Sequence, residues 1–110
     1  MKQITYAGKS FVTGSDIADA VVRLTAALGI SSETSAVTIP AMDENGHVTT
    51  ADLVLGPATE ILAIAITSDL PEIIDSEVVA SLDARAAHLS PSRAVASPEP
   101  IPGQWGLNEL

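Results

Sequence analysis

The sequence contains no cysteine and no long hydrophobic run. Without cysteine, a disulfide framework and a thiolate metal site are both excluded. The longest apolar run, residues 61–66, is far shorter than the roughly twenty residues that a membrane-spanning helix needs. The first residues also lack the apolar segment of a secretory signal. We therefore expect a cytoplasmic protein without a membrane partner.

Basic and aromatic residues are also scarce. Fourteen acidic residues face five basic ones, which gives a net charge of −9, and the basic residues are scattered. Phosphate neutralisation requires clustered Lys and Arg, and base stacking requires aromatic side chains, so we expect no nucleic-acid partner. The acidic residues are spread along the chain, which is typical of a solubilising surface. An acidic inhibitor of a basic partner is the alternative.

Two segments have the apolar spacing of amphipathic helices. The first, residues 16–28, carries a single stripe formed by Ile17, Val21, Leu24 and Leu28. Thr13 and Ser15 compete as its N-cap, and Gly29 is expected to end it. A looser stripe predicts a second helix over residues 70–89, with a proline in its first turn.

The remaining part of the first ninety residues has strand-like patterns. Short β-prone triplets on either side of Gly8 predict a hairpin. Residues 37–41 and 48–55 alternate around an Asn-Gly turn and predict another, with Pro40 at an edge or a bulge. Residues 61–66 are apolar on both faces. Such a strand is either central and covered on both faces, or it exposes one face to a partner.

The predicted element order is β-β-α-β-β-β-α, which indicates an α+β fold. Helices packed on one face of an antiparallel sheet of four to five strands, in two layers, would bury both apolar stripes. We expect residues 1–90 to form a single domain. Residues 91–110 are rich in Pro, Ser and Ala and predict a flexible C-terminal tail, because they cannot bury enough surface to offset chain entropy.

Two stretches of the chain are similar to a family of small uncharacterised actinobacterial proteins. They are residues 4–11 (ITYAGKSF) running into 15–20 (SDIADA), and residues 51–59 (ADLVLGPAT). The resemblance covers about residues 3–66 and consists of a hairpin-to-helix junction and a strand-turn. It implies no activity and no site residues.

Two groups of residues contain parts of functional motifs. Gly8-Lys9-Ser10 matches the end of a phosphate-binding loop, but Gln3 stands where the motif needs its first glycine. A polar cluster gathers around the second hairpin turn and consists of Asp43, Glu44, His47 and Asp52. It lacks the ligand spacing of a calcium loop. A hairpin turn and a solvated turn explain the two groups, so we predict no cofactor or metal ligands.

The sequence also gives little support for catalysis. His47 and His88 are the only histidines, and no G-x-S-x-G elbow accompanies the serines. The carboxylate pairs Asp16/Asp19 and Asp75/Glu77 are explained by helix-end electrostatics and by a solvated face. We therefore predict no catalytic residues. The alternative is a small enzyme or ligand-binding protein with a pocket between the helix at 16–28 and the sheet.

A non-enzymatic protein–protein interaction module, forming a homodimer, is the leading functional hypothesis. The predicted interface lies on the two-faced strand and consists of Leu62, Ile64 and Ile66. The tail provides a second prediction, since a lone Trp near leucines is typical of a docking peptide. The docking residues are Trp105, Leu107 and Leu110. We expect self-association and a further protein partner that the tail binds.

Overall fold

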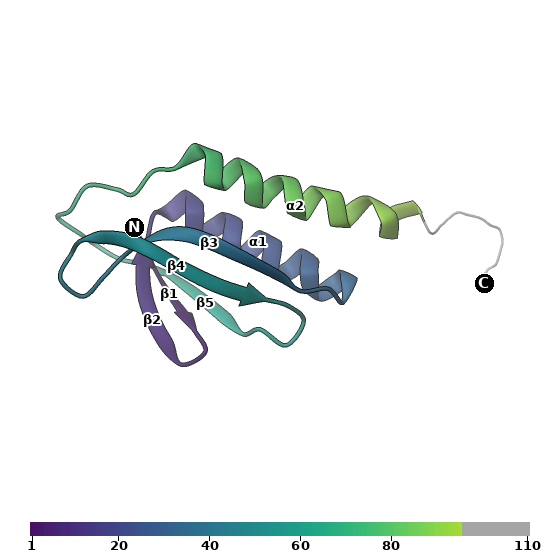
Figure 1. Ribbon diagram of the computed structural model, residues 1–110, viewed down its shortest axis with the longest axis horizontal. Coiled ribbons are helices and arrows are strands. Elements are labelled where there is room, and N and C mark those ends of the chain that lie inside the picture. The colour runs from purple at the N-terminus through teal and green to yellow at the C-terminus, as the bar shows by residue number, and fades with distance from the viewer. Residues whose placement is uncertain (96–110) are drawn as a thin grey trace.

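The computed structural model describes residues 1–95, with side chains described to residue 89. The predicted docking residues Trp105, Leu107 and Leu110 therefore lie outside the described residues, as does most of the predicted tail. The elements in chain order are β1 (Lys2–Tyr6), β2 (Lys9–Thr13), α1 (Ser15–Ser31), β3 (Ser35–Met42), β4 (Val48–Leu55), β5 (Ile61–Ala65) and α2 (Ser76–Val95). This order confirms the predicted α+β fold (Figure 1).

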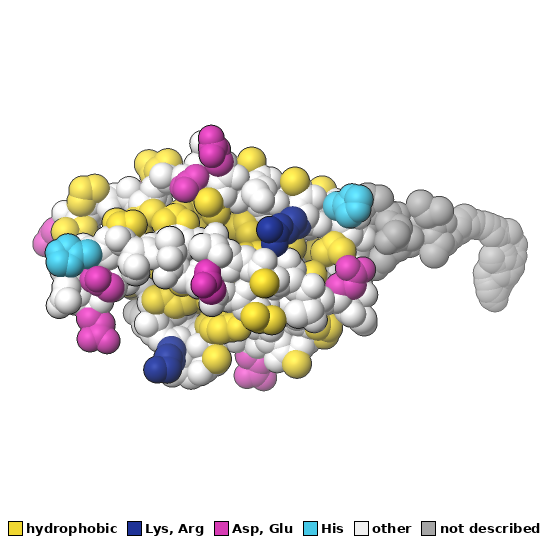
Figure 2. All heavy atoms as spheres, viewed as in Figure 1, with side chains coloured by type: hydrophobic (Ala, Val, Ile, Leu, Met, Phe, Trp, Pro, Cys, Tyr) yellow, Lys and Arg dark blue, Asp and Glu magenta, His cyan; other side chains and the backbone are white. Residues whose placement is uncertain are grey.

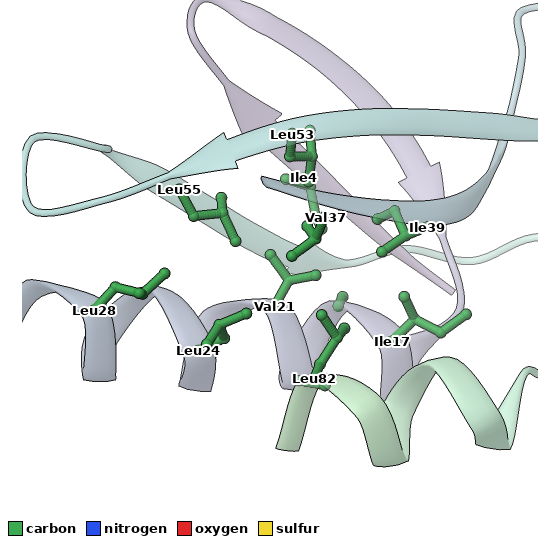
Figure 3. Close-up of a cluster of buried hydrophobic side chains, with 12 residues drawn as sticks. Ile4, Ile17, Val21, Leu24, Leu28, Val37, Ile39, Leu53, Leu55 and Leu82 are labelled. Atoms are coloured by element: carbon green, nitrogen blue, oxygen red, sulfur yellow. The ribbon is translucent and has the colours of Figure 1, made fainter. Parts of the chain in front are cut away.

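The strands form one antiparallel sheet with the order β4-β3-β2-β1-β5. Its core lies where the apolar stripe of α1 packs against side chains of β1, β3 and β4 (Figure 3). The largest fully buried side chains include Ile4, Ile17, Leu24, Leu28, Ile39 and Leu55. Helix α2 runs beside α1 in the same direction and contributes Leu82 to the core (Figure 1). The stripe predicted over residues 16–28 is thus the principal helical contribution to the core.

Pro40 lies where the sheet splits. Strands β2 and β3 are neighbours, yet their register contains a single pair, Val12 with Met42. The Thr13 hydroxyl donates to the Pro40 carbonyl oxygen at 2.6 Å, so this side of Pro40 faces β2. A proline nitrogen cannot donate a hydrogen bond to a neighbouring strand. At Pro40 the nitrogen faces β2, where the β2–β3 pairing is interrupted, so no hydrogen bond is required of it. Strand β3 lies between β4 and β2, so it is not an edge strand, although Pro40 does mark interrupted pairing with β2.

The ends of α1 differ from the prediction. The N-cap is Gly14, which makes no side-chain cap, and the helix continues past Gly29 to Ser31. Ser32 ends it in the left-handed conformation, with φ of 56°, and the Glu33 N–H donates to the Leu28 carbonyl oxygen at 3.1 Å. This pattern is a Schellman ending, in which a serine holds the position usually given to glycine.

Glu72 replaces the expected local cap of α1. Its carboxylate accepts the Ser15 N–H at 2.6 Å and binds the Met1 ammonium group at 2.6 Å. These two contacts lower the pKa of Glu72 below its ordinary value. The sequence contains no sign of this interaction, because Glu72 lies 57 residues after Ser15.

Helix α2 begins later and ends later than the range 70–89. Asp75 is its N-cap and accepts the Val78 N–H at 3.1 Å, so the segment before it is irregular rather than helical. The helix continues to Val95, beyond the predicted start of the tail at residue 91. Within residues 1–95, neither helix combines the length and the apolarity needed to cross a bilayer.

Candidate protein-interaction site

Strand β5, which contains the predicted interface, is an edge strand of the sheet. Ile61 and Ala63 pack against the core, while Leu62 and Ile64 point to the other face, and each is 53% exposed. The structure therefore excludes a central strand covered on both faces and shows one face of β5 exposed. Ile66 follows the strand and is half-buried. We name Leu62, Ile64 and Ile66 the β5 strip.

The residues across the sheet from Leu62 and Ile64 are uncharged. Across the register with β1, Leu62 lies opposite Thr5 and Ile64 lies opposite Gln3. The Thr5 hydroxyl is in turn hydrogen-bonded to that of Ser10 on β2, at 2.9 Å. A protein face with these residues can bury two large aliphatic side chains on contact without separating a charge from water.

The charge distribution distinguishes β5 from other surfaces. No charged residue lies between Glu60 and Asp69, although the chain carries a net charge of −9. Elsewhere, acidic side chains are dispersed over the face seen in Figure 2 rather than gathered in one patch. Two copies of an acidic protein repel each other, so contact through an acid-free segment keeps the repulsion low.

The polar cluster at the second hairpin turn has a structural role. The Asp43 carboxylate accepts the backbone N–H groups of Asn45 and His47, each at 2.9 Å, which lowers its pKa. Asp52 accepts the Thr38 hydroxyl at 2.6 Å, and His47 is exposed. Among the described residues, no three His, Asp or Glu side chains are grouped to hold a metal ion.

Gly8-Lys9-Ser10 likewise belongs to a hairpin. Ala7 and Gly8 form the two-residue turn between β1 and β2, with φ values of 52° and 80°. Positive φ at both positions is the geometry of the tightest hairpin turns. Lys9 and Ser10 belong to β2, whereas a phosphate-binding loop would lead into a helix.

His88 lines a surface hollow of about 500 Å³, together with Glu33 and Arg85. The hollow lies where the end of α1 meets α2 and the start of β3. The Arg85 guanidinium donates to the Ser35 hydroxyl and to the Ala36 carbonyl oxygen, both at 2.9 Å. The hollow therefore holds a carboxylate and an imidazole on exposed side chains, with its arginine already engaged by β3.

A second hollow, of about 680 Å³, was not indicated by the sequence. The β1–β2 turn and the loop before β5 form its walls, and its lining includes Tyr6, Glu60 and Leu62. Only one of these side chains is charged, and no histidine lines it. The hollow adjoins one end of the β5 strip and places the Glu60 carboxylate beside Leu62.

Searches of family models, of curated proteins and of solved structures find no match to this chain. The resemblance to actinobacterial proteins remains a prediction. The fold and the surface of the described residues are accordingly the basis for a functional proposal.

Proposed function

We propose that the protein is a non-enzymatic interaction module that self-associates through the β5 strip. The observation that carries the proposal is the exposure of Leu62 and Ile64 on an edge strand without charged residues. Exposed apolar residues gathered on one element mark interaction surfaces more often than scattered ones do. Trp105, Leu107 and Leu110 remain the predicted docking segment for a different protein.

Other exposed apolar residues provide the competing surface. Val48, Leu70 and Ile74 lie near one another along a shallow hollow that also includes Glu72 and Asp75. Self-association there would bring the carboxylates of two copies together. The β5 strip has no such disadvantage, which is why we favour it.

Light scattering coupled to size-exclusion chromatography at micromolar concentrations tests the proposal. The wild-type protein is expected to elute as a dimer, and Leu62→Lys combined with Ile64→Lys is expected to convert it to a monomer. Val48→Lys combined with Ile74→Lys is the matched control, because it makes the same charge change at two exposed aliphatic positions. A monomeric wild type would overturn the proposal, and a dimer lost only in the control pair would place the interface elsewhere.

Ligand binding at the His88 hollow is the alternative, supported by the presence of Glu33 and His88 in one lining. A fragment mixture titrated into labelled protein would test it by NMR. Shifts concentrated at Leu24, Ser81 and His88 would favour a ligand-binding protein over an interaction module.

A further inference from the structure

We infer that a second copy of this chain joins the free edge of β5 as an antiparallel strand, with Ala63 of each copy facing its counterpart. This inference rests on the proposed self-association and adds its geometry. The sheet would then continue from one copy into the other through main-chain hydrogen bonds.

The backbone directions in β5 follow from one hydrogen bond. The Ile66 N–H donates to the Met1 carbonyl oxygen at 3.1 Å and extends the β1–β5 pairing. Backbone groups alternate in direction along a strand, so those of Leu62 and Ile64 also point toward β1. The N–H and C=O groups of Ile61, Ala63 and Ala65 therefore point to the free edge.

The first hairpin confirms this alternation independently. Its two-residue turn makes Tyr6 and Lys9 the closing hydrogen-bonded pair. Tyr6 thus directs its backbone groups toward β2, and Thr5 directs its groups toward β5. Thr5 lies opposite Leu62 in the register. The arguments from the two ends of β1 therefore agree that the backbone groups of Leu62 point toward β1.

The outward-pointing residues are symmetric about Ala63. When an antiparallel copy is placed with Ala63 opposite Ala63, Ile61 lies opposite Ala65 of the second copy, and the reverse also holds. Each outward N–H then faces an outward C=O. A closed twofold contact requires self-complementarity of this kind.

The side chains fit the same register. On the outer face, Leu62 lies opposite Ile64 of the second copy in a non-hydrogen-bonded pair, where side chains approach most closely. On the inner face, Ala63 packs against the core of its own copy. The side chain that would face it from the second copy is only the methyl group of the other Ala63. Glu60 lies opposite Ile66 of the second copy, so no two carboxylates oppose each other.

Strand β5 also lacks the devices that keep sheet edges from pairing. Natural edges carry charges, prolines or bulges, and residues 61–66 contain no charge or proline. The other edge strand, β4, contains Asp52, and its Val54 backbone is hydrogen-bonded by the Tyr6 hydroxyl. The two edges therefore differ, since β4 carries a charged residue and a side-chain contact on its backbone that β5 does not have among the described residues.

Cysteine crosslinking tests the register, because the chain has no cysteine of its own. Leu62→Cys and Ile64→Cys proteins, one of them isotope-labelled, are mixed and oxidised in a glutathione buffer. In the inferred register their Cα atoms are roughly 4.5 Å apart, within the range of a disulfide. In either variant alone the two cysteines are about 8 Å apart, which is too far for a disulfide. Val48→Cys serves as the exposed β4 control.

The mixed disulfide is expected to form about tenfold faster than either homodisulfide or the Val48→Cys product. A light-scattering dimer in which the homodisulfides form as fast as the mixed one would overturn the register and leave the proposed self-association standing. A monomeric wild type would instead remove both. The two failures are therefore distinguishable by intact mass and light scattering on the same samples.

Discussion

The hydroxyl of Tyr6 makes two hydrogen bonds with the backbone of Val54. It donates to the Val54 carbonyl oxygen at 2.8 Å and accepts the Val54 N–H at 3.1 Å. Tyr6 belongs to β1 and Val54 to β4, and β3 and β2 separate these strands in the sheet. The sheet must therefore curl, so that one side chain spans from β1 to the far edge strand.

Replacement of Tyr6 by Phe should weaken this curl. The ring would remain, while the Val54 N–H would lose its partner and become free to exchange with solvent, and the Val54 carbonyl oxygen would keep only the Thr59 hydroxyl, at 3.5 Å. We expect a loss of about 1 kcal/mol in the free energy of unfolding, measured by urea denaturation, and faster hydrogen exchange at the Val54 amide. Thr5→Val, which removes an exposed hydroxyl pair with Ser10, should leave the Val54 exchange rate unchanged. An unaltered Val54 rate in Tyr6→Phe would contradict the bridge.

Two glycines, one that caps the first helix and one inside it, should respond to alanine in opposite directions. A Cβ atom at Gly14 would lie 1.8 Å from the Ile73 carbonyl oxygen, so the backbone before α2 would have to move. We expect Gly14→Ala to cost about 2 kcal/mol in the free energy of unfolding. Gly29 lies inside the helix, with nothing near its Cβ position. Gly29→Ala should raise the stability by about 0.5–1 kcal/mol.

Thermal and urea denaturation of both variants would check these values. The comparison is informative because the two substitutions change the chain in the same way. Equal effects at both positions would mean that the close approach of Ile73 to Gly14 does not constrain the fold.

Local patterns in the sequence were sufficient for the element types. The stripe from Ile17 to Leu28 is repeated at helical spacing, and the Asn-Gly pair lies at the turn between β3 and β4. Element boundaries depended on contacts that are distant in sequence. Glu72, for example, caps the start of α1 from 57 residues further along the chain. Such pairings are decided only when the chain folds, so local signals cannot reveal them.

The candidate site was only partly foreseeable. The apolar residues on both faces of 61–66 left open whether the strand is covered on both faces or exposes one, and Leu62 and Ile64 are exposed. The position of β5 at the edge depends on its pairing with β1, nearly sixty residues earlier, and no local pattern encodes that choice. Trp105 lies beyond the described residues, so its predicted docking role remains a prediction.

Glu72 should make the stability depend on pH in the acid range. Its pKa is lowered by the Met1 ammonium group and by the Ser15 N–H, below the ordinary value of 4.5. A lowered pKa stabilises the folded state above the unfolded-state value, and this contribution is lost as the pH falls through the folded-state value. Glu72→Gln should therefore be less stable than wild type at pH 7, and the difference should shrink as the pH falls below 4.5.

Urea denaturation at a series of pH values would measure this difference. Glu60→Gln is the control, since Glu60 forms no ion pair within the described residues. A difference in the free energy of unfolding between Glu72→Gln and wild type that stays constant down to acid pH would contradict the lowered pKa of Glu72.

Helix α2 should depend on Leu82 far more than on its ion pair with α1. Leu82 is 3% exposed within the core, and Leu82→Ala should cost about 3 kcal/mol in the free energy of unfolding. Arg23 donates twice to the Asp83 carboxylate, each time at 3.0 Å, but both side chains are substantially exposed. Removing that pair should cost less than about 1 kcal/mol. Urea denaturation of both variants measures the two losses in the free energy of unfolding. A larger loss in Asp83→Asn than in Leu82→Ala would contradict this prediction.

Salt should strengthen self-association through the β5 strip. Each copy carries a net charge of −9, so two copies repel each other, while the proposed contact itself contains no ion pair. Screening lengths fall from about 30 Å at 0.01 M salt to about 10 Å at 0.1 M, which reduces the repulsion and leaves the apolar contact intact. Sedimentation equilibrium across this range should show a dimer dissociation constant that decreases as salt is added.

An acidic inhibitor bound to a basic partner would show the opposite trend, because screening weakens an attraction between unlike charges. A dimer that dissociates as salt rises would mean that ion pairs, rather than Leu62 and Ile64, hold the two copies together.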